Sequence, residues 1–133
     1  MKCSCESGLT YVECCNRYHA GNASAPTAEA LMRSRYAAYV QGEIAYLVAT
    51  THPSKQHPGL EADYRFTSET IQWIGLEVIQ TFQGEAGGET GKVEFKASYL
   101  QGGQRSIHHE VSRFKRHARK WHYLDGVVSD QVV

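Results

Sequence analysis

The sequence lacks any surplus of charge, and it lacks long apolar runs. Its 133 residues hold 14 Lys and Arg against 14 Asp and Glu, so the formal net charge is zero. A zero balance excludes a wholly basic surface for nucleic acid, although a local basic patch stays compatible with it. The apolar runs are far shorter than a membrane span requires. The N-terminus, Met1 to Cys5, has no apolar signal-peptide core, which favours a cytosolic protein.

What is present is ordinary for a globular protein. The chain is 41% hydrophobic and 21% charged, which excludes a disordered or fibrous class. The length fits one compact domain with a small appendage.

Cysteine is absent after position 15, and all four cysteines lie at Cys3, Cys5, Cys14 and Cys15. In a reducing cytosol, such a cluster indicates metal ligands rather than disulfides. Four thiolates suit tetrahedral Zn²⁺, and Gly8 lets the loop turn back so that both pairs reach one ion. A closed site of four ligands leaves no position for water, so this zinc is expected to be structural.

Three alternatives remain for these residues. The four cysteines could stay reduced without a metal, or two of them could form a redox pair. His19 could also replace Cys15 as a ligand if the Cys15 side chain points away.

The first half of the remaining chain has helical patterns. Residues 21–26 are small, polar and rich in breakers, which predicts a linker. Thr27 is a good N-cap for a helix over 28–41, which Gly42 ends. A shorter helix is expected over 44–48, ending before His52 and Pro53. Residues 54–66 show no clear period and suggest an irregular loop, with a short helix over 67–72.

The second half alternates with a period of two. Four strands are expected, over 73–82, 93–99, 107–115 and 120–128. Helices followed by antiparallel strands give an α+β class, in which one curved sheet wraps the helices. The expected organisation is a zinc module over 1–20, a linker over 21–26, a main domain over 27–128 and a tail over 129–133.

The cysteine-rich segment resembles the SEC-C motif, a small zinc module best known from the tail of the SecA translocation ATPase. Residues 3–15, CSCESGLTYVECC, match its cysteine spacing and its Ser-Gly and Tyr positions. Glu6 stands where the motif usually has Gly, which predicts a strained turn. Leu9 replaces a usual Lys, which removes a basic contact.

The remaining motifs resemble the YchJ family of bacterial proteins. They are LMRSRYAAY over 31–39, THP over 51–53, SRF over 112–114 and WHYLDG over 121–126. The resemblance implies a SEC-C-type module joined to a nuclear transport factor 2-like cone, which is a curved antiparallel sheet packed on helices. Many members carry a second SEC-C motif at the C-terminus, whereas this sequence stops at Val133. Cones of this type often dimerise through the outer sheet face, so the resemblance also implies a homodimer as one assembly.

A cone normally encloses an apolar cavity between sheet and helices, where a ligand would bind. Alternation places Glu110, Ser112 and Phe114 on one face of the third strand, and Trp121, Tyr123 and Asp125 on one face of the fourth. The full set of cavity candidates is Arg33, Arg35, Tyr36, Tyr39, Glu110, Ser112, Phe114, Trp121 and Tyr123.

Two interpretations apply to the polar members of this set. Glu110 or Asp125 could act as a general base, with Tyr36 or Tyr123 stabilising an oxyanion. Alternatively, Glu110 forms a structural ion pair with Arg33 or Arg35, and this interpretation is favoured. No nucleophile motif or phosphate-binding glycine loop accompanies these residues.

The seven histidines do not predict a second metal site. His108 and His109 are neighbours on a strand, so their side chains point to opposite faces. His52 and His57 each precede a proline and are interpreted as loop residues.

A basic cluster lies around the turn between the last two strands. Five of eight consecutive residues are positive: Arg113, Lys115, Arg116, Arg119 and Lys120. This hairpin could contact RNA or an acidic protein. The favoured alternative is an ordinary solvated turn.

Two functional hypotheses follow from these observations. The first is a non-enzymatic adaptor whose zinc module presents Leu9, Tyr11, Arg17 and Tyr18 to a protein partner, as similarity to SecA implies. The second is a cone enzyme or carrier that acts on a small apolar molecule in the cavity.

Overall fold

Helices come first in this protein and antiparallel strands follow, as a computed structural model of residues 1–132 shows. In chain order the elements are α1 (Asn16–His19), α2 (Ala28–Gln41), α3 (Ile44–Ala49), the 3₁₀ helix η1 (Pro53–Lys55), α4 (Leu60–Thr70), β1 (Gln72–Gln83), β2 (Thr90–Gln101), β3 (Gln104–His117), β4 (Lys120–Val128) and β5 (Gln131–Val132). The expected α+β class is therefore confirmed. Among these described residues, no helix is long and apolar enough to span a bilayer.

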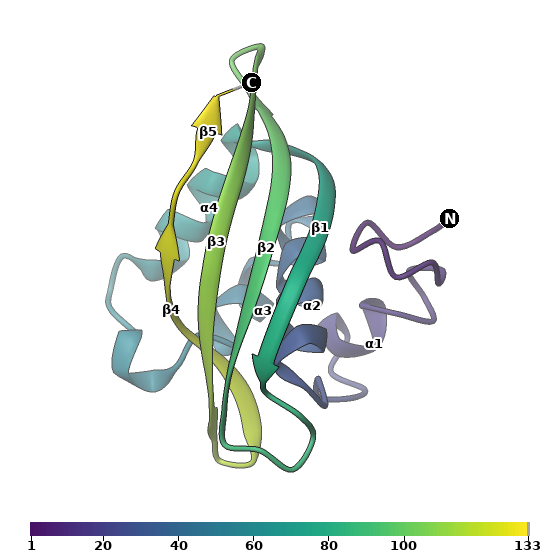
Figure 1. The fold of residues 1–133 in the computed structure, drawn as a ribbon, viewed down its shortest axis with the longest axis vertical. Coiled ribbons are helices and arrows are strands. Elements are labelled where there is room, and N and C mark those ends of the chain that lie inside the picture. The colour runs from purple at the N-terminus through teal and green to yellow at the C-terminus, as the bar shows by residue number, and fades with distance from the viewer. Residues whose placement is uncertain (133) are drawn as a thin grey trace.

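One curved sheet carries the helices on a single face (Figure 1). Its strands pair in the order β1-β2-β3-β4, all antiparallel. The short β5 pairs with the beginning of β3 through Ser106↔Val132 and Ile107↔Gln131. The segment expected to be a tail thus contributes a strand.

Helix α2 is the central helix of the layer behind the sheet. The Thr27 hydroxyl accepts a hydrogen bond from the Ala30 N–H at 3.0 Å, and Gly42 ends the helix with a φ of 76°. Leu31, Met32 and Tyr36 are buried on the helix face that meets the sheet. They form one core cluster with four sheet residues, Val93, Ala97, Phe114 and Trp121.

Helix α4 differs from the expectation, which was a loop over 54–66 and a short helix over 67–72. The helix begins at Leu60 and ends at Thr70, with Glu61 and Asp63 in its first turn. Only Leu60 of this helix is buried, and Phe66 is 66% exposed. A helix that packs on a core has a broad apolar stripe in its sequence. Helix α4 covers a cavity instead, so its apolar stripe is too narrow to predict a helix.

The segment expected to be a linker is exposed over residues 21–24, and its end at Ala25 and Pro26 packs against the core. The Trp121 indole donates to the Pro26 carbonyl at 3.1 Å, and the Ala28 N–H donates to the Gly84 carbonyl at 2.9 Å. A Cβ atom added at Gly91 would lie 2.8 Å from the Gly84 nitrogen, so only glycine permits this close approach. These contacts hold the start of α2 at the base of the β1–β2 hairpin.

Candidate functional site

The four cysteines form a buried cluster at the N-terminus. All four sulfur atoms lie within 4.8 Å of one another, with 3.6 Å between Cys5 and Cys14 and 3.9 Å between Cys14 and Cys15. A tetrahedral thiolate site with metal–sulfur bonds of about 2.3 Å needs sulfur atoms about 3.8 Å apart. The cluster therefore fits a metal ion in its present geometry.

Short-range hydrogen bonds bring the two cysteine pairs together. Lys2 and Thr10 form an antiparallel bridge, and the Cys3 N–H donates to the Leu9 carbonyl at 2.8 Å. Glu6 has a φ of 67°, in the left-handed region that glycine adopts readily, as the departure from the SEC-C pattern predicted. Cys15 then lies at the N-cap of α1.

The thiols differ in their acidity even before a metal binds. A hydrogen bond from the Cys15 thiol lowers the pKa of Cys5, and the same bond together with burial raises the pKa of Cys15. Thiolate is the form that ligates metals, so the cluster favours one ligand that is already charged.

His19 and Arg33 dock the cysteine module onto α2. The two ring nitrogens of His19 contact the Tyr11 hydroxyl at 2.7 Å and the Ser34 carbonyl at 2.8 Å. Arg33 donates to the Cys5 carbonyl at 2.6 Å. His19 therefore lies outside the ligand set, and the expectation that Arg33 lines the cavity is wrong.

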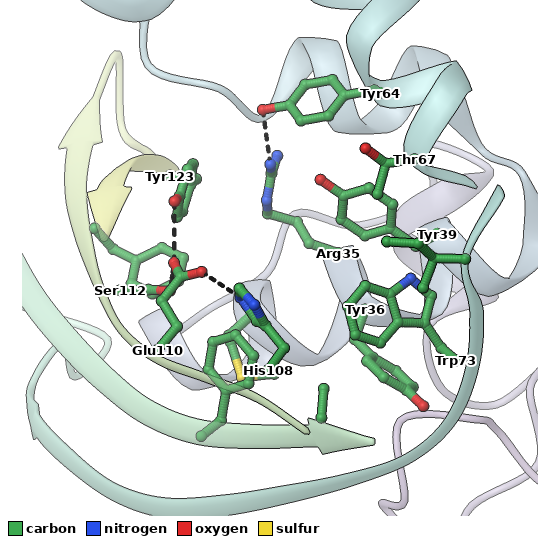
Figure 2. Close-up of a pocket in the computed structure, with 15 residues that line it drawn as sticks. Arg35, Tyr36, Tyr39, Tyr64, Thr67, Trp73, His108, Glu110, Ser112 and Tyr123 are labelled. Carbon is green, nitrogen blue, oxygen red and sulfur yellow. Dashed lines mark hydrogen bonds and ion pairs between the residues drawn. The ribbon is translucent and has the colours of Figure 1, made fainter. Parts of the chain in front are cut away.

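A cavity of about 290 Å³ lies between α2, α4 and the concave face of the sheet. Figure 2 shows side chains from these three elements facing the same space. Seven of the lining side chains are aromatic, a typical composition for a small-molecule site: Tyr36, Tyr39, Tyr64, Trp73, Phe95, Phe114 and Tyr123.

Most of the cavity candidates from the sequence line this space: Arg35, Tyr36, Tyr39, Glu110, Ser112, Phe114 and Tyr123. Trp121 does not, because it is buried beneath the start of α2, where its indole donates to Pro26. Asp125 does not, because it forms an outer-face ion pair with Arg113, with 2.6 Å between Arg113 Nε and Asp125 Oδ1. Its assignment as a cavity base is therefore wrong.

A β-bulge explains the error at Asp125. The β3–β4 register runs Arg113↔Asp125 and then Phe114↔Tyr123, which leaves Leu124 as an extra residue. One extra residue moves every side chain beyond it to the opposite face of the strand. Tyr123 consequently points inward and Asp125 points outward.

Glu110 is the buried charge of the cavity, and it is held by three donors. His108 Nε2 lies 2.7 Å from Glu110 Oε1, while the Ser112 and Tyr123 hydroxyls donate to Glu110 Oε2, the latter at 3.0 Å (Figure 2). Burial raises the pKa of Glu110, but the hydrogen bonds from His108 and Ser112 outweigh it and lower the pKa below its usual value. Glu110 is therefore a carboxylate at neutral pH.

His108 extends this network to the protein surface. Its Nδ1 atom lies 2.8 Å from Oδ1 of Asp130, which is 41% exposed. Burial lowers the pKa of His108, but the Glu110 hydrogen bond and the charges of Glu110 and Asp130 outweigh it, so the net shift is upward. Both ring nitrogens are therefore occupied by carboxylates.

The expected ion pair between Glu110 and Arg33 or Arg35 does not form among the described residues. Arg35 donates to the Leu47 carbonyl at 2.8 Å and to the Tyr64 hydroxyl at 3.0 Å. Its guanidinium also lies 4.8 Å from the centre of the Tyr123 ring. Arg35 and Glu110 are thus connected through Tyr123 instead of touching each other.

Eight lining residues escaped the sequence analysis, among them His108, Tyr64 and Trp73. His108 lies two positions before Glu110, and the alternation that placed Glu110 would have placed His108 on the same face. Tyr64 belongs to the helix that was mistaken for a loop. Trp73 lies on β1. No position of that strand is fully buried, so burial does not separate a face toward the cavity from a face toward solvent.

The basic hairpin is partly committed to structural contacts. Arg113 pairs with Asp125, and Arg116 donates to the Gly88 carbonyl at 2.8 Å while lying 4.7 Å from the Trp121 ring centre. Lys115, Arg119 and Lys120 are the exposed remainder of the five. Among the described residues, the positive surface of this hairpin is therefore smaller than the sequence suggests.

Comparison with known proteins identifies the family. The family model described as "YchJ, middle NTF2-like domain" matches residues 27–126. The chain belongs to the YchJ family. Within the wider set of similar proteins, UPF0225 protein SCO1677 of Streptomyces coelicolor is 46% identical over 96% of each chain. UPF0225 protein GSU1048 of Geobacter sulfurreducens is 41% identical, covering 93% of this chain and 77% of its own.

Solved structures extend the YchJ likeness to the cysteine module. RPA3114 of Rhodopseudomonas palustris, described as a SEC-C motif containing protein, has a TM-score of 0.85 and 36% identity over 98% of this chain and 100% of its own. A SEC-C motif containing protein of Psychrobacter arcticus has a TM-score of 0.77 and 30% identity over 98% of this chain and 84% of its own. The expected pairing of a SEC-C-type module with a cone is confirmed.

Proposed function

We propose that this protein is a small-molecule-binding protein whose N-terminal module is stabilised by structural zinc. The observation that carries the proposal is the indole Nε1 atom of Trp73. It belongs to a cavity-lining side chain, and it is buried without a hydrogen-bond partner. A buried N–H without a partner costs free energy, and a ligand acceptor that displaces the side chains covering this atom would remove that cost.

The polar groups favour binding over proton transfer. A general base needs a pKa near the working pH, whereas the hydrogen bonds of Glu110 lower its pKa. His108 has no free ring nitrogen to offer a substrate. The preferred ligand is therefore a small planar molecule that presents an acceptor to Trp73 and a donor to Glu110.

Benzamide is a suitable probe, because its ring fits an aromatic cavity and its amide supplies both an acceptor and donors. We expect it to shift the indole N–H signal of Trp73 in a saturable NMR titration, and to leave the signal of Trp121 unchanged. Toluene lacks the polar groups, and benzoate would bring a second anion to Glu110, so both should bind at least tenfold more weakly.

Plugging the cavity provides the control for this titration. Thr67 lies on the cavity side of α4, so Thr67→Phe should abolish the benzamide shift. Glu69→Phe places the same ring on the exposed side of that helix and should bind benzamide normally. Equal binding by the two variants, or no binding of benzamide to the unmodified protein, would contradict the proposed function.

Zinc is the metal that best fits the cysteine module. Four buried thiols with tetrahedral spacing form a closed site, which supplies folding energy and offers no open position for catalysis. When bound, the ion would crosslink the loop around Gly8 to the beginning of α1.

A second candidate function is contact with a protein partner through the same module. Leu9 is 49% exposed and Val12 is 69% exposed, so two apolar side chains project from the loop. Tyr11 and Tyr18, by contrast, are partly buried. A Leu9→Ser/Val12→Ser variant that retains zinc should lose such a partner, while Cys14→Ser should lose both zinc and partner.

A further inference from the structure

Three histidines that are distant in sequence meet at one end of the sheet. His52 immediately precedes η1, His117 ends β3 and His122 lies in β4. Their ring centres are 5.5 Å (His52–His117), 6.2 Å (His52–His122) and 5.8 Å (His117–His122) apart. The three imidazoles therefore occupy the corners of a nearly equilateral triangle.

The backbone fixes this arrangement on all three sides. The His52 N–H donates to the Tyr123 carbonyl at 2.8 Å, which aligns the segment before η1 with β4. In the β3–β4 ladder, Lys115 pairs with His122 and His117 pairs with Lys120. The cluster is thus a property of the tertiary fold, which explains why His52 looked like an ordinary loop residue in the sequence.

The triangle is close to the size that one metal ion requires. With metal–nitrogen bonds of about 2.0–2.1 Å and tetrahedral angles, the ring centres of two imidazole ligands lie about 5 Å apart. His117 is exposed, and His52 and His122 are only half-buried. Binding one ion would require these exposed or half-buried side chains to rotate, because their ring nitrogens do not all lie within 4.8 Å of one another.

One of the rings already has the supporting contact that metal-binding histidines use. His122 Nδ1 donates to the Lys120 carbonyl at 2.9 Å, which leaves Nε2 free to ligate. His52 Nδ1 lies 2.8 Å from the Ser54 hydroxyl, and without metal it also accepts from the Ser54 N–H at 3.1 Å. Ligation through Nε2 requires the His52 proton to move to Nδ1, which breaks the bond from the Ser54 N–H and leaves the Ser54 hydroxyl as the acceptor.

Burial and the surrounding positive charge disfavour protonation of His52 and His122. Burial, followed by the charges of His117, Lys115 and Lys55, lowers the pKa of His52. Burial also lowers the pKa of His122, with His117, His52 and Lys120 acting in the same direction. Neutral imidazole is the ligating form, although the nearby lysines weaken the attraction for a cation.

We propose that His52, His117 and His122 form a second metal site, which takes a borderline divalent transition metal ion such as Zn²⁺. It differs from the cysteine cluster in having three nitrogen ligands and an open position toward solvent. The nearby lysines make it the weaker of the two sites.

The test uses protein whose cysteine cluster is already loaded with one zinc per chain. ZnCl₂ is added at pH 7.5, and binding is followed by equilibrium dialysis and by the NMR signals of the histidine rings. We expect a second zinc per chain, with the signals of His52, His117 and His122 shifting together.

Matched variants separate this cluster from adventitious binding. His117→Gln should weaken the second zinc at least tenfold while retaining the first, and His57→Gln, an exposed histidine outside the triangle, should change neither. Lowering the pH from 7.5 to 5.5 should also release the second zinc, because protons compete for the three rings.

Two results would overturn the proposal. One is a second zinc that binds equally well to His117→Gln, or that never binds. The other is a titration in which inorganic phosphate, and not Zn²⁺, shifts the three histidine signals, which would identify the cluster as an anion site.

Discussion

At the residue scale, the charge state of the cavity depends on His108. This side chain connects buried Glu110 to half-exposed Asp130, with distances of 2.7 Å and 2.8 Å. Its raised pKa means that the protonated ring stabilises the folded state. That contribution is fully present below the ordinary value of 6.5 and is lost as the pH rises through the folded-state pKa.

Replacing His108 by Gln should therefore destabilise the protein in a pH-dependent manner. The Glu110 carboxylate contributes above its ordinary pKa of 4.5, so the pair is strongest between about pH 4.5 and 6.5. We expect the loss in unfolding free energy to be on the order of 2 kcal/mol near pH 6 and to shrink as the pH rises through the raised folded-state pKa of His108, as measured by urea unfolding.

His109→Gln is the matched control for this series. His109 is the next residue on β3, points to the opposite face and contacts Glu94 at 2.7 Å. Its replacement should cost less than that of His108. A His108→Gln cost that does not vary with pH would contradict a protonated His108.

Individual residues also show what the sequence can specify. Alternation along β3 was sufficient to place Glu110, Ser112 and Phe114 on one face, because the extra residue of the bulge lies on β4 and not on β3. The same argument failed at Asp125, since the bulge at Leu124 depends on how β4 pairs with β3. Ring contacts such as Arg35 on Tyr123 depend on three-dimensional packing and have no sequence signature.

At the element scale, β4 is shaped to leave room for the Glu110 side chain. Gly126 lies beside Ser112 in the β3–β4 register, and a Cβ atom there would overlap the Glu110 carboxylate. Close packing against Glu110 therefore explains the glycine in the WHYLDG segment. Backbone conformation does not, because its φ is not in the left-handed region.

Gly126→Ala should displace Glu110 and weaken its bonds to His108 and Tyr123. We expect a loss of about 1–3 kcal/mol in unfolding free energy, together with loss of the benzamide shift at Trp73. Gly75→Ala is the control, because a Cβ atom at that β1 position meets open space. Equal effects at the two glycines would show that strand flexibility, and not contact with Glu110, determines the result.

Element boundaries were predictable where one face is buried in a continuous core. Helix α2 and strand β4 match their expected ranges of 28–41 and 120–128, since capping residues and alternation mark them clearly. Helix α4 did not match, because its side chains Tyr64 and Thr67 face a cavity and its other side faces solvent.

At the scale of the whole molecule, a metal-dependent module rests on a domain that has its own core. The cysteine cluster contacts α2 through Ala37 and through the Arg33 bond to Cys5, while the sheet core is a separate cluster. Metal removal should therefore unfold residues 1–20 and leave the sheet folded.

Hydrogen exchange measures this separation directly. In Cys14→Ser, amides over residues 1–20 should exchange at nearly unprotected rates, while amides in β2 and β3 stay protected. Added Zn²⁺ should restore protection to chelator-treated unmodified protein and not to the variant. Loss of protection throughout β2 and β3 would show that the cone requires the metal to fold.

The shortest described strand, β5, holds in place a residue that contributes to the charge of the cavity. Strand β5 is only two residues long, and Asp130 immediately precedes it. A two-residue strand opens at a lower free-energy cost than a long strand such as β3, which separates only when the domain unfolds. The outer counter-charge of His108 therefore depends on the pairing of two residues, and opening of this short strand would change the charge of the cavity wall without unfolding the sheet.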